Sequence, residues 1–220
     1  MEKDALLGKT KDELQELVAG HGLPRFTATQ LADWIYKKKV NNFSEMSNLS
    51  KKSRSLLAEH YVVGHIPHTR VDASSDGTKK YLFPSGTKNY IEAAYIPEEK
   101  RNTLCVSSQA GCKMGCLFCM TGKQGFQANL SPREIINQIW SLPEREQVTN
   151  LVFMGMGEPF DNMDNLMKSL EILTSSWGMD ISPRKITVST IGIIPAMTRF
   201  IQESDCHLAV SLHTPFEDER

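Results

Sequence analysis

The chain has 220 residues, of which 40% are apolar and 23% are charged, and its formal net charge is −1 at pH 7. This composition is typical of a soluble globular protein with one or two domains, and the near-neutral charge gives no overall signal for nucleic acid. No apolar stretch approaches the roughly 20 residues of a membrane span, and the charged N-terminus is unlike a secretory signal, so we expect a cytoplasmic protein without a membrane partner.

Residues 1–65 are predicted to form a small helical domain. Thr10 and Glu13 form a capping box at the start of one helix, and leucines follow at helical spacing. Thr27 is predicted to begin a second helix in the same way with Gln30, and Ser50 precedes a third. This domain holds ten Lys and Arg against eight Asp and Glu, with basic clusters near 37–39 and 51–54. Such clusters are usually a solvated face, and binding of nucleic acid is the alternative.

Residues 66–100 are predicted to form a β-meander. Asp76-Gly77 lies between two strand-like runs and is a strong hairpin signal. Ser85-Gly86 makes the next turn, and a third strand is expected over 90–96.

Residues 101–220 alternate between strands and helices, which predicts four parallel strands with crossover helices in an α/β fold. Ser131 and Pro132 open the first of these helices as N-cap and first helical residue. The run at 148–154 is apolar throughout and predicts a strand buried on both faces. The last strand would leave an open edge, and another helix should begin at 219–220, so we expect a partial barrel that continues beyond residue 220. The predicted strands are 103–107, 148–154, 186–190 and 208–212, and the later helices are 163–176 and 195–202.

Three cysteines in one glycine-rich segment indicate a metal site. Cys112, Cys116 and Cys119 have the spacing Cys-x3-Cys-x2-Cys. Three thiolates can bind three irons of a 4Fe-4S cluster and leave the fourth iron open for S-adenosylmethionine (SAM), whereas an electron-transfer ferredoxin uses four cysteines. A zinc site with Cys105 as a fourth thiolate is the alternative, although zinc cysteines usually come as two closely spaced pairs.

The segment TLCVSSQAGCKMGCLFCMTGKQGF, residues 103–126, resembles the signature of RlmN-type methyltransferases, which are radical SAM enzymes. The resemblance covers nearly the whole chain. Other radical SAM enzymes share the triplet and the aromatic residue at Phe118, but they lack the preceding LCVSSQ. The resemblance implies a 4Fe-4S cluster, SAM, and methylation of adenosine C2 in 23S rRNA and tRNA. It further implies an electron donor such as flavodoxin or ferredoxin, and we expect a monomer.

Residues that follow the predicted strands are candidates for binding SAM. Gly155-Met156-Gly157-Glu158-Pro159 follows one strand and could by itself be a plain turn. Ser189 ends the next strand, and Ser211-Leu212-His213 ends the one after, where such residues are more often structural. The resemblance implies that the matching positions bind SAM. These positions are Gly157, Glu158, Ser189, Ser211, Leu212 and His213.

Cys105 and Glu92 would by themselves be a small core residue and a solvated carboxylate. The resemblance makes Cys105 the resolving thiol and Glu92 the proton acceptor of a route that uses two SAM molecules. One SAM methylates a cysteine near the C-terminus, and the second gives a 5′-deoxyadenosyl radical that takes hydrogen from this methylcysteine. The carbon radical adds to C2, and Cys105 then releases the product and leaves a disulfide bond. The chain has no cysteine after Cys206, so we expect these 220 residues alone not to turn over.

Three alternatives stay open at this point. A Cfr-type enzyme would methylate C8 of the same adenosine, and another radical SAM enzyme, such as an activase, would share only the triplet. A zinc-binding module would not be an enzyme. The predicted division is a helical RNA-binding-like domain at 1–65, a β-meander at 66–100 and a partial radical SAM barrel at 101–220.

Overall fold

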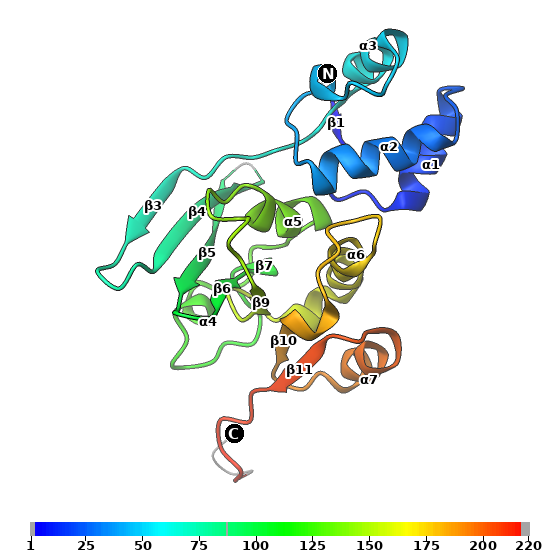
Figure 1. Ribbon diagram of the computed structural model, residues 1–220. Coiled ribbons are helices and arrows are strands. Elements are labelled where there is room, and N and C mark those ends of the chain that lie inside the picture. Colours follow the sequence, from blue (N-terminus) through cyan, green and yellow to red (C-terminus); the bar gives the residue numbers. More distant parts are fainter. Residues whose placement is uncertain (1–2, 87, 217–220) are drawn as a thin grey trace.

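The computed structural model describes residues 3–86 and 88–216. Its centre is a mixed seven-stranded sheet with the order β11-β10-β9-β6-β5-β4-β3, and helices pack on one side of it (Figure 1). This is the predicted α/β arrangement. In the described part of the chain, no helix is long and apolar enough to cross a membrane. The helix expected at 219–220 lies outside the described residues.

The N-terminal region is helical as predicted, and two of its three expected caps are confirmed. Thr10 and Glu13 form the capping box of α1, and the Ser50 side chain accepts a hydrogen bond from Ser53 N at the start of α3. The predicted cap at Thr27 is wrong. Helix α2 begins one residue earlier, and Thr27 is buried in the core instead of facing the free N–H groups. The helices are α1 (Lys11–Gly20), α2 (Phe26–Ala32), the π-helical turn η1 (Asp33–Lys37), the 3₁₀ turn η2 (Phe43–Glu45) and α3 (Lys51–His60).

A short parallel pair of strands, which the sequence did not predict, closes the N-terminal region. Strand β1 (Asp4–Ala5) pairs with β2 (Tyr61–Val62), and Leu7 N continues the pairing with a 2.8 Å hydrogen bond to Val63 O. The two ends of this region are thereby held together.

The β-meander is present with the predicted turns. Gly77 has φ +87° in the β3–β4 turn, a backbone conformation that favours glycine. The strands are β3 (Arg70–Ala73), β4 (Lys79–Ser85) and β5 (Asn89–Pro97). Strand β5 pairs antiparallel with β6, so the sheet continues across residue 100. The division of the chain at that residue stays a prediction.

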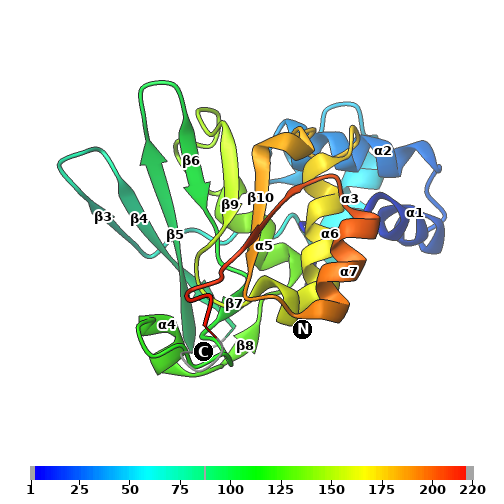
Figure 2. The same cartoon turned by 90° about the horizontal axis from the view of Figure 1, so that it is seen from below.

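The predicted parallel strands and crossover helices are present in the described residues. Strand β6 pairs with β9, β9 with β10, and β10 with β11, all parallel. The helices between them lie on the same side of the sheet (Figure 2). The strands are β6 (Asn102–Cys105), β9 (Asn150–Phe153), β10 (Ile186–Thr190) and β11 (His207–Val210), and the helices are α5 (Pro132–Trp140), α6 (Met163–Thr174) and α7 (Ile194–Glu203).

Shorter elements complete the loops after the parallel strands. Strand β7 pairs antiparallel with β8, and the segment between them contains α4. These elements are β7 (Gln109–Ala110), α4 (Met120–Gln124), β8 (Ala128–Asn129), and the 3₁₀ turns η3 (Pro159–Asn162) and η4 (Pro183–Lys185).

The two faces of the sheet differ in chemistry. The helix-covered face carries buried apolar side chains such as Leu104, Leu151 and Phe153. The opposite face carries a mixture of small, polar and apolar side chains, among them Cys105, Ser189 and Val152, which are only partly buried. The expectation that the 148–154 strand is buried on both faces is therefore wrong, because its residues alternate between buried and half-buried.

The N-terminal region packs on the helical side of the sheet. Trp140 Nε1 at the end of α5 donates a 2.7 Å hydrogen bond to Ile35 O, and both residues are buried. Lys168 Nζ of α6 lies 2.5 Å from Glu13 Oε1 of α1. One continuous hydrophobic core joins the N-terminal region to the helix-covered face of the sheet. The other face, called the open face below, therefore lies on the side of the sheet away from the N-terminal helices (Figure 2).

Candidate functional site at the strand ends

The cysteine triplet lies in the loop between β7 and β8. Cys112, Cys116 and Cys119 are free thiols that are partly exposed. Cys119 N donates a 3.0 Å hydrogen bond to Cys116 O, and Gly115 has φ +64°, so the backbone turns tightly between the cysteines. The loop therefore presents three thiols from one short segment.

No disulfide joins the five cysteines, all of which lie among the described residues and are free. The predicted disulfide is not supported here; it requires a partner for Cys105 that is absent from the 220 residues. Within the described ranges, no group of three or more His, Cys, Asp or Glu side chains is placed around a single metal-ion position.

The LCVSSQ segment, residues 104–109, contacts the glycine-containing segment 155–158 that follows β9. Gly155 N donates to Val106 O at 3.1 Å, and Met156 N donates to Ser107 Oγ at 2.9 Å. Gly157 has φ +93°, and a Cβ at this position would come within 2.4 Å of Gln109 Cβ. Packing against Gln109 therefore requires a residue without a Cβ at position 157, whether or not a ligand also approaches the strand end.

Strand β6 ends at Cys105, two residues before the predicted end at Ser107. The reason is that the backbone of Ser107 bonds to a side chain, and only its hydroxyl bonds to a neighbouring strand, at Glu92 O of β5. Its N–H donates to Gln138 Oε1 at 2.8 Å, and its carbonyl accepts from Gln138 Nε2 at 2.9 Å. The buried Gln138 of α5 thereby holds the start of the loop.

Glu158 is buried, with 4% of its surface exposed. One oxygen, Oε1, accepts hydrogen bonds from Thr190 Oγ1 at 2.6 Å and Phe160 N at 3.1 Å, and Oε2 accepts from Ile191 N at 3.1 Å. The carboxylate therefore ties the end of β9 to the end of β10. Its predicted role toward the SAM amino group stays a prediction.

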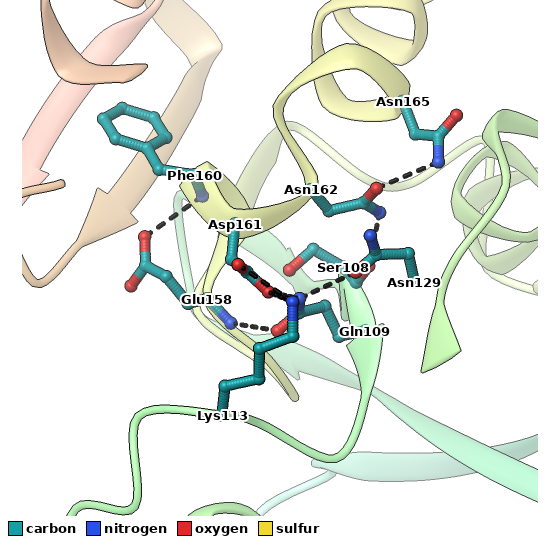
Figure 3. A network of polar contacts seen from close by, with 9 residues as sticks. All are labelled: Ser108, Gln109, Lys113, Asn129, Glu158, Phe160, Asp161, Asn162 and Asn165. Atoms are coloured by element: carbon teal, nitrogen blue, oxygen red, sulfur yellow. Dashed lines mark hydrogen bonds and ion pairs between the residues drawn. The ribbon is translucent and has the colours of Figure 1, made fainter. Parts of the chain in front are cut away.

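A polar network links the cysteine loop with this strand-end segment (Figure 3). Gln109 Oε1 accepts from Glu158 N at 2.9 Å, and Gln109 Nε2 donates to Asp161 Oδ2 at 2.7 Å. Asp161 in turn pairs with Lys113 Nζ at 2.8 Å, and Lys113 follows Cys112 directly. Sequence reasoning missed Gln109 and Asp161 as site residues, although Gln109 belongs to the segment that distinguishes the chain from other triplet proteins.

A cavity of about 400 Å³ lies between the cysteine loop and the ends of β10 and β11. Its walls include Cys116 and Phe118 on one side and Ser211 and His213 on the other. The rings of Phe118 and His213 are 4.8 Å apart, and His213 has φ +61°. Ser211 Oγ lies 3.2 Å from Ser189 Oγ. The cavity thus brings Cys116 of the triplet together with two predicted cofactor residues, Ser211 and His213, whereas Gly157, Glu158 and Ser189 do not line it.

Two features lie outside this arrangement. Leu212 is 52% exposed and is not part of the cavity wall. A larger cavity of about 570 Å³ lies among α1, α6 and α7, where Glu13, Lys168 and Arg199 form ion pairs. None of the predicted site residues lines that second cavity.

Cys105 and Glu92 lie on the open face of the sheet. Cys105 is paired in register with Ala94 of β5 and Val152 of β9, and burial raises the pKa of its thiol. Glu92 lies two residues before Ala94 on β5, is about half exposed, and pairs with Lys80 Nζ at 3.0 Å. The two predicted catalytic side chains are therefore close along neighbouring strands, and neither belongs to the cysteine loop.

Comparisons with known proteins assign the chain to a family. Residues 106–220 match the family model of the radical SAM superfamily. The chain belongs to the radical SAM superfamily. Residues 5–63 match the model described as the ribosomal RNA large subunit methyltransferase N-terminal domain. A radical SAM methyltransferase from Sphaerobacter thermophilus, known from a crystal structure, superposes with a TM-score of 0.91 at 38% identity, covering 99% of this chain and 66% of that one. The predicted α/β partial radical SAM fold is confirmed.

Curated relatives carry the RlmN name and confirm the predicted resemblance. A probable dual-specificity RNA methyltransferase RlmN from Phocaeicola vulgatus is 58% identical over 99% of this chain and 62% of its own length. The dual-specificity RNA methyltransferase RlmN from Geotalea uraniireducens is 43% identical over all of this chain and 64% of its own length. The chain spans less than two thirds of the length of these relatives.

Membership in the radical SAM superfamily implies the predicted 4Fe-4S cluster and SAM. The residues present fit both groups. Three free thiols on one loop can hold three irons, because cluster ligation requires thiolates that no disulfide has consumed. The adjoining cavity offers the polar side chains Ser211 and His213 opposite Cys116, which suits a polar ligand held between them.

Proposed function

We propose that this chain contributes the RNA-binding and radical SAM parts of a methyltransferase that modifies C2 of adenosine in 23S rRNA and tRNA. The observation that carries the proposal is the match of residues 5–63 to the ribosomal RNA large subunit methyltransferase N-terminal domain, in a chain whose radical SAM part is packed against it. Other radical SAM enzymes, such as activases, account for the triplet but not for this N-terminal region.

Cofactor binding is assigned to the strand ends. Cys112, Cys116 and Cys119 hold the cluster, and the cavity wall formed by Ser211 and His213 receives SAM. Bound there, the cluster supplies the electron for reductive cleavage of SAM. Gly157, Glu158 and Ser189 lie at the neighbouring strand ends and are the other proposed SAM residues, and Leu212, which is exposed outside the cavity wall, is proposed from the resemblance alone. The contacts of Glu158 favour an indirect part, in which its carboxylate fixes the ends of β9 and β10 around the ligand.

Cys105 and Glu92 are assigned to the later steps. Cys105 is a thiol on the open face, outside the cysteine loop, as a resolving thiol requires. Its raised pKa keeps it protonated at neutral pH, so this proton must be removed before the thiolate attacks the sulfur of the cysteine that is linked to C2, which breaks the carbon–sulfur bond, forms the disulfide and releases the methylated RNA. Glu92 is half exposed and can accept the C2 proton once an RNA base displaces its Lys80 partner. The methyl-carrying cysteine is not among the 220 residues.

The proposed partners are 23S rRNA and tRNA, with flavodoxin or ferredoxin as electron donor and a monomeric enzyme. The basic clusters of the N-terminal region are the proposed RNA contact. Lys37, Lys51 and Lys52 are exposed, whereas Lys38 and Lys39 form ion pairs with acidic side chains. The first three lysines are therefore the better candidates for phosphate contacts.

RNA modification in cells tests the proposal. The complete reading frame that encodes this chain is expressed in bacteria that lack their own adenosine C2 methyltransferase, and digested RNA is analysed by mass spectrometry. We expect 2-methyladenosine in both 23S rRNA and tRNA, and none with Cys116→Ala. Methylation at C8 would instead assign the Cfr type, and unmodified adenosine in both RNAs would refute an RNA methyltransferase.

Anaerobic reconstitution of the 220-residue chain separates the cluster from zinc. We expect about four irons per chain and visible iron–sulfur absorbance, both reduced by Cys112→Ala, Cys116→Ala or Cys119→Ala. The matched control is Cys206→Ala, which removes a cysteine outside the loop and should leave the iron content unchanged. Stoichiometric zinc without iron would support the zinc-binding module.

A further inference from the structure

Gln109 is fully buried, and its side-chain amide connects two segments of the proposed cofactor site. Its oxygen accepts from Glu158 N, in the segment after β9. Its nitrogen donates to Asp161 Oδ2 at 2.7 Å and to Asn129 Oδ1 at 2.8 Å. Its backbone N–H donates to Met156 O at 3.1 Å. Position 109 therefore needs a side chain that accepts one hydrogen bond, from Glu158 N, and donates others, to Asp161 and Asn129.

The connection continues on both sides of Gln109. Asp161 pairs with Lys113, which follows Cys112 in the cysteine loop, and the Lys113 ammonium lies 4.4 Å from the centre of the Phe126 ring. On the other side, the Glu158 carboxylate accepts from Thr190 Oγ1 and Ile191 N at the end of β10. A continuous polar path therefore runs from the cysteine loop to the end of β10, and Figure 3 shows its part from Lys113 to Glu158.

The path leads toward the cavity beside the triplet. Ser211 N donates to Thr190 O at 2.8 Å, and Ile191 and Ser211 both line that cavity opposite Cys116. Gly157 permits the close approach on which the path depends, because a Cβ there would overlap the Gln109 side chain. The Gln109 amide is therefore one of several contacts between these segments, beside the bonds from Ser108 N to Met156 O and from Asn162 Nδ2 to Ser108 O, and it is the one that reaches both Glu158 and Asp161.

We propose that Gln109 is a positioning residue that fixes the cysteine loop relative to segment 155–158, and so fixes where SAM meets the cluster. This inference rests on the proposed function. Gln109 touches neither the cysteines nor the cavity directly, so its effect is transmitted through Asp161 and Glu158. Buried polar networks of this kind hold one geometry when every member is satisfied.

The experiment compares two buried side-chain amides. Gln109→Met removes the amide in the path. Asn137→Leu is the matched control, because the buried Asn137 amide also donates to and accepts from a backbone, that of Ile66, and bonds to Ser141 Oγ. Neither partner belongs to the cysteine loop, to segment 155–158 or to the cavity wall. The reconstituted 220-residue chains are compared by iron content, thermal unfolding, SAM affinity and the electron paramagnetic resonance spectrum of the reduced cluster with and without SAM.

We expect both variants to retain iron and to lose similar thermal stability. Gln109→Met should weaken SAM binding by about tenfold or more, the scale of one lost buried hydrogen bond, and diminish the spectral change that SAM causes. Asn137→Leu should bind SAM like the original chain. Unchanged SAM affinity in Gln109→Met, or an equal loss in Asn137→Leu, would overturn the positioning role. An original chain that binds neither iron nor SAM would instead refute the proposed function.

A second variant separates positioning from general damage. Gln109→Glu places a second carboxylate against Asp161 and should weaken SAM binding strongly. In the double variant Gln109→Glu with Asp161→Asn, the amide donor lies at position 161 and the carboxylate acceptor at position 109, so the two groups of this contact have exchanged places. We expect this exchange to restore at least half of the lost binding free energy for SAM. Failure of the exchange to improve on Gln109→Glu alone would contradict a role through this contact.

Discussion

Cys105 differs from the triplet cysteines in its surroundings. It lies within the sheet between Ala94 and Val152, and burial raises the pKa of its thiol above the ordinary value of 9.0. Only the thiolate reacts with iodoacetamide, so alkylation of Cys105 in the metal-free chain should be slow at pH 7.5. Below the pKa, the rate should increase by about tenfold for each unit of pH. Mass spectrometry of the modified peptides measures the alkylation rate of Cys105, and the rate at Cys116 in the same sample is the internal comparison. A rate that is independent of pH between 7 and 9 would contradict this prediction.

Gly157 offers a second test at the scale of one residue. Gly157→Ala combines a positive φ with a contact of 2.4 Å to Gln109 Cβ, and should lower the free energy of unfolding by about 2–3 kcal/mol. Gly22→Ala is the control, since Gly22 has φ +64° but open space around its Cβ position. The control should lose only about 1 kcal/mol, the cost of the backbone conformation alone. Urea unfolding measures both, and equal losses would show that the contact with Gln109 does not matter.

The candidate site was predictable from the sequence where residues signal their chemistry locally. The spacing of the triplet and the position of Ser211 and His213 after a strand predicted that they lie at the same end of the sheet, and one cysteine of the triplet, Cys116, shares a cavity with both residues. Gln109 and Asp161 could not be found this way. Their importance comes from contacts between loops that are 52 residues apart, and a buried amide looks like any other polar loop residue in the sequence.

At the scale of elements, helix α5 shows how a local signal and a distant contact combine. Ser131 Oγ accepts from Glu134 N at 3.3 Å, and Glu134 Oε1 accepts from Ser85 Oγ of β4 at 2.7 Å. Ser131→Ala should lower the free energy of unfolding by about 1 kcal/mol through loss of the cap. Ser131→Thr keeps the hydroxyl, which accepts from Glu134 N and donates to Glu134 Oε2, and should retain most of that stability. If the two variants lose equal stability in denaturant titrations, the cap contributes nothing.

Element boundaries were predictable to the extent that a few neighbouring residues determine them. The capping boxes at Thr10 and Ser131 consist of residues within one helical turn, and both are present. The expected cap at Thr27 failed because burial of its side chain against the core outweighs a weak local signal. The β1–β2 pair joins two-residue strands from opposite ends of the N-terminal region, and such short segments have no periodicity to reveal them.

At the scale of the whole molecule, the sheet runs from the meander into the parallel strands without interruption. The sequence showed the change from hairpins to crossover helices near residue 100, but not that β5 and β6 pair. Antiparallel pairing there places Glu92 beside the strand that carries Cys105. The helices, including those of the N-terminal region, lie on the other side, and this separates the proposed catalytic face from the basic N-terminal surface.

RNA binding by the N-terminal region is the test at this scale. Charge reversal of the exposed lysines Lys37, Lys51 and Lys52 to Glu should weaken binding of the 220-residue chain to a tRNA probe. Because each phosphate contact releases counterions, the slope of log K against log salt should become less steep by about 2–3. The control reverses three exposed basic residues elsewhere: Lys100, Arg101 and Lys185. The control has the same net charge, so non-specific repulsion lowers the affinity of both variants alike. An equal fall in slope for both would mean that the N-terminal lysines attract RNA only through the overall charge, without local contacts to phosphate.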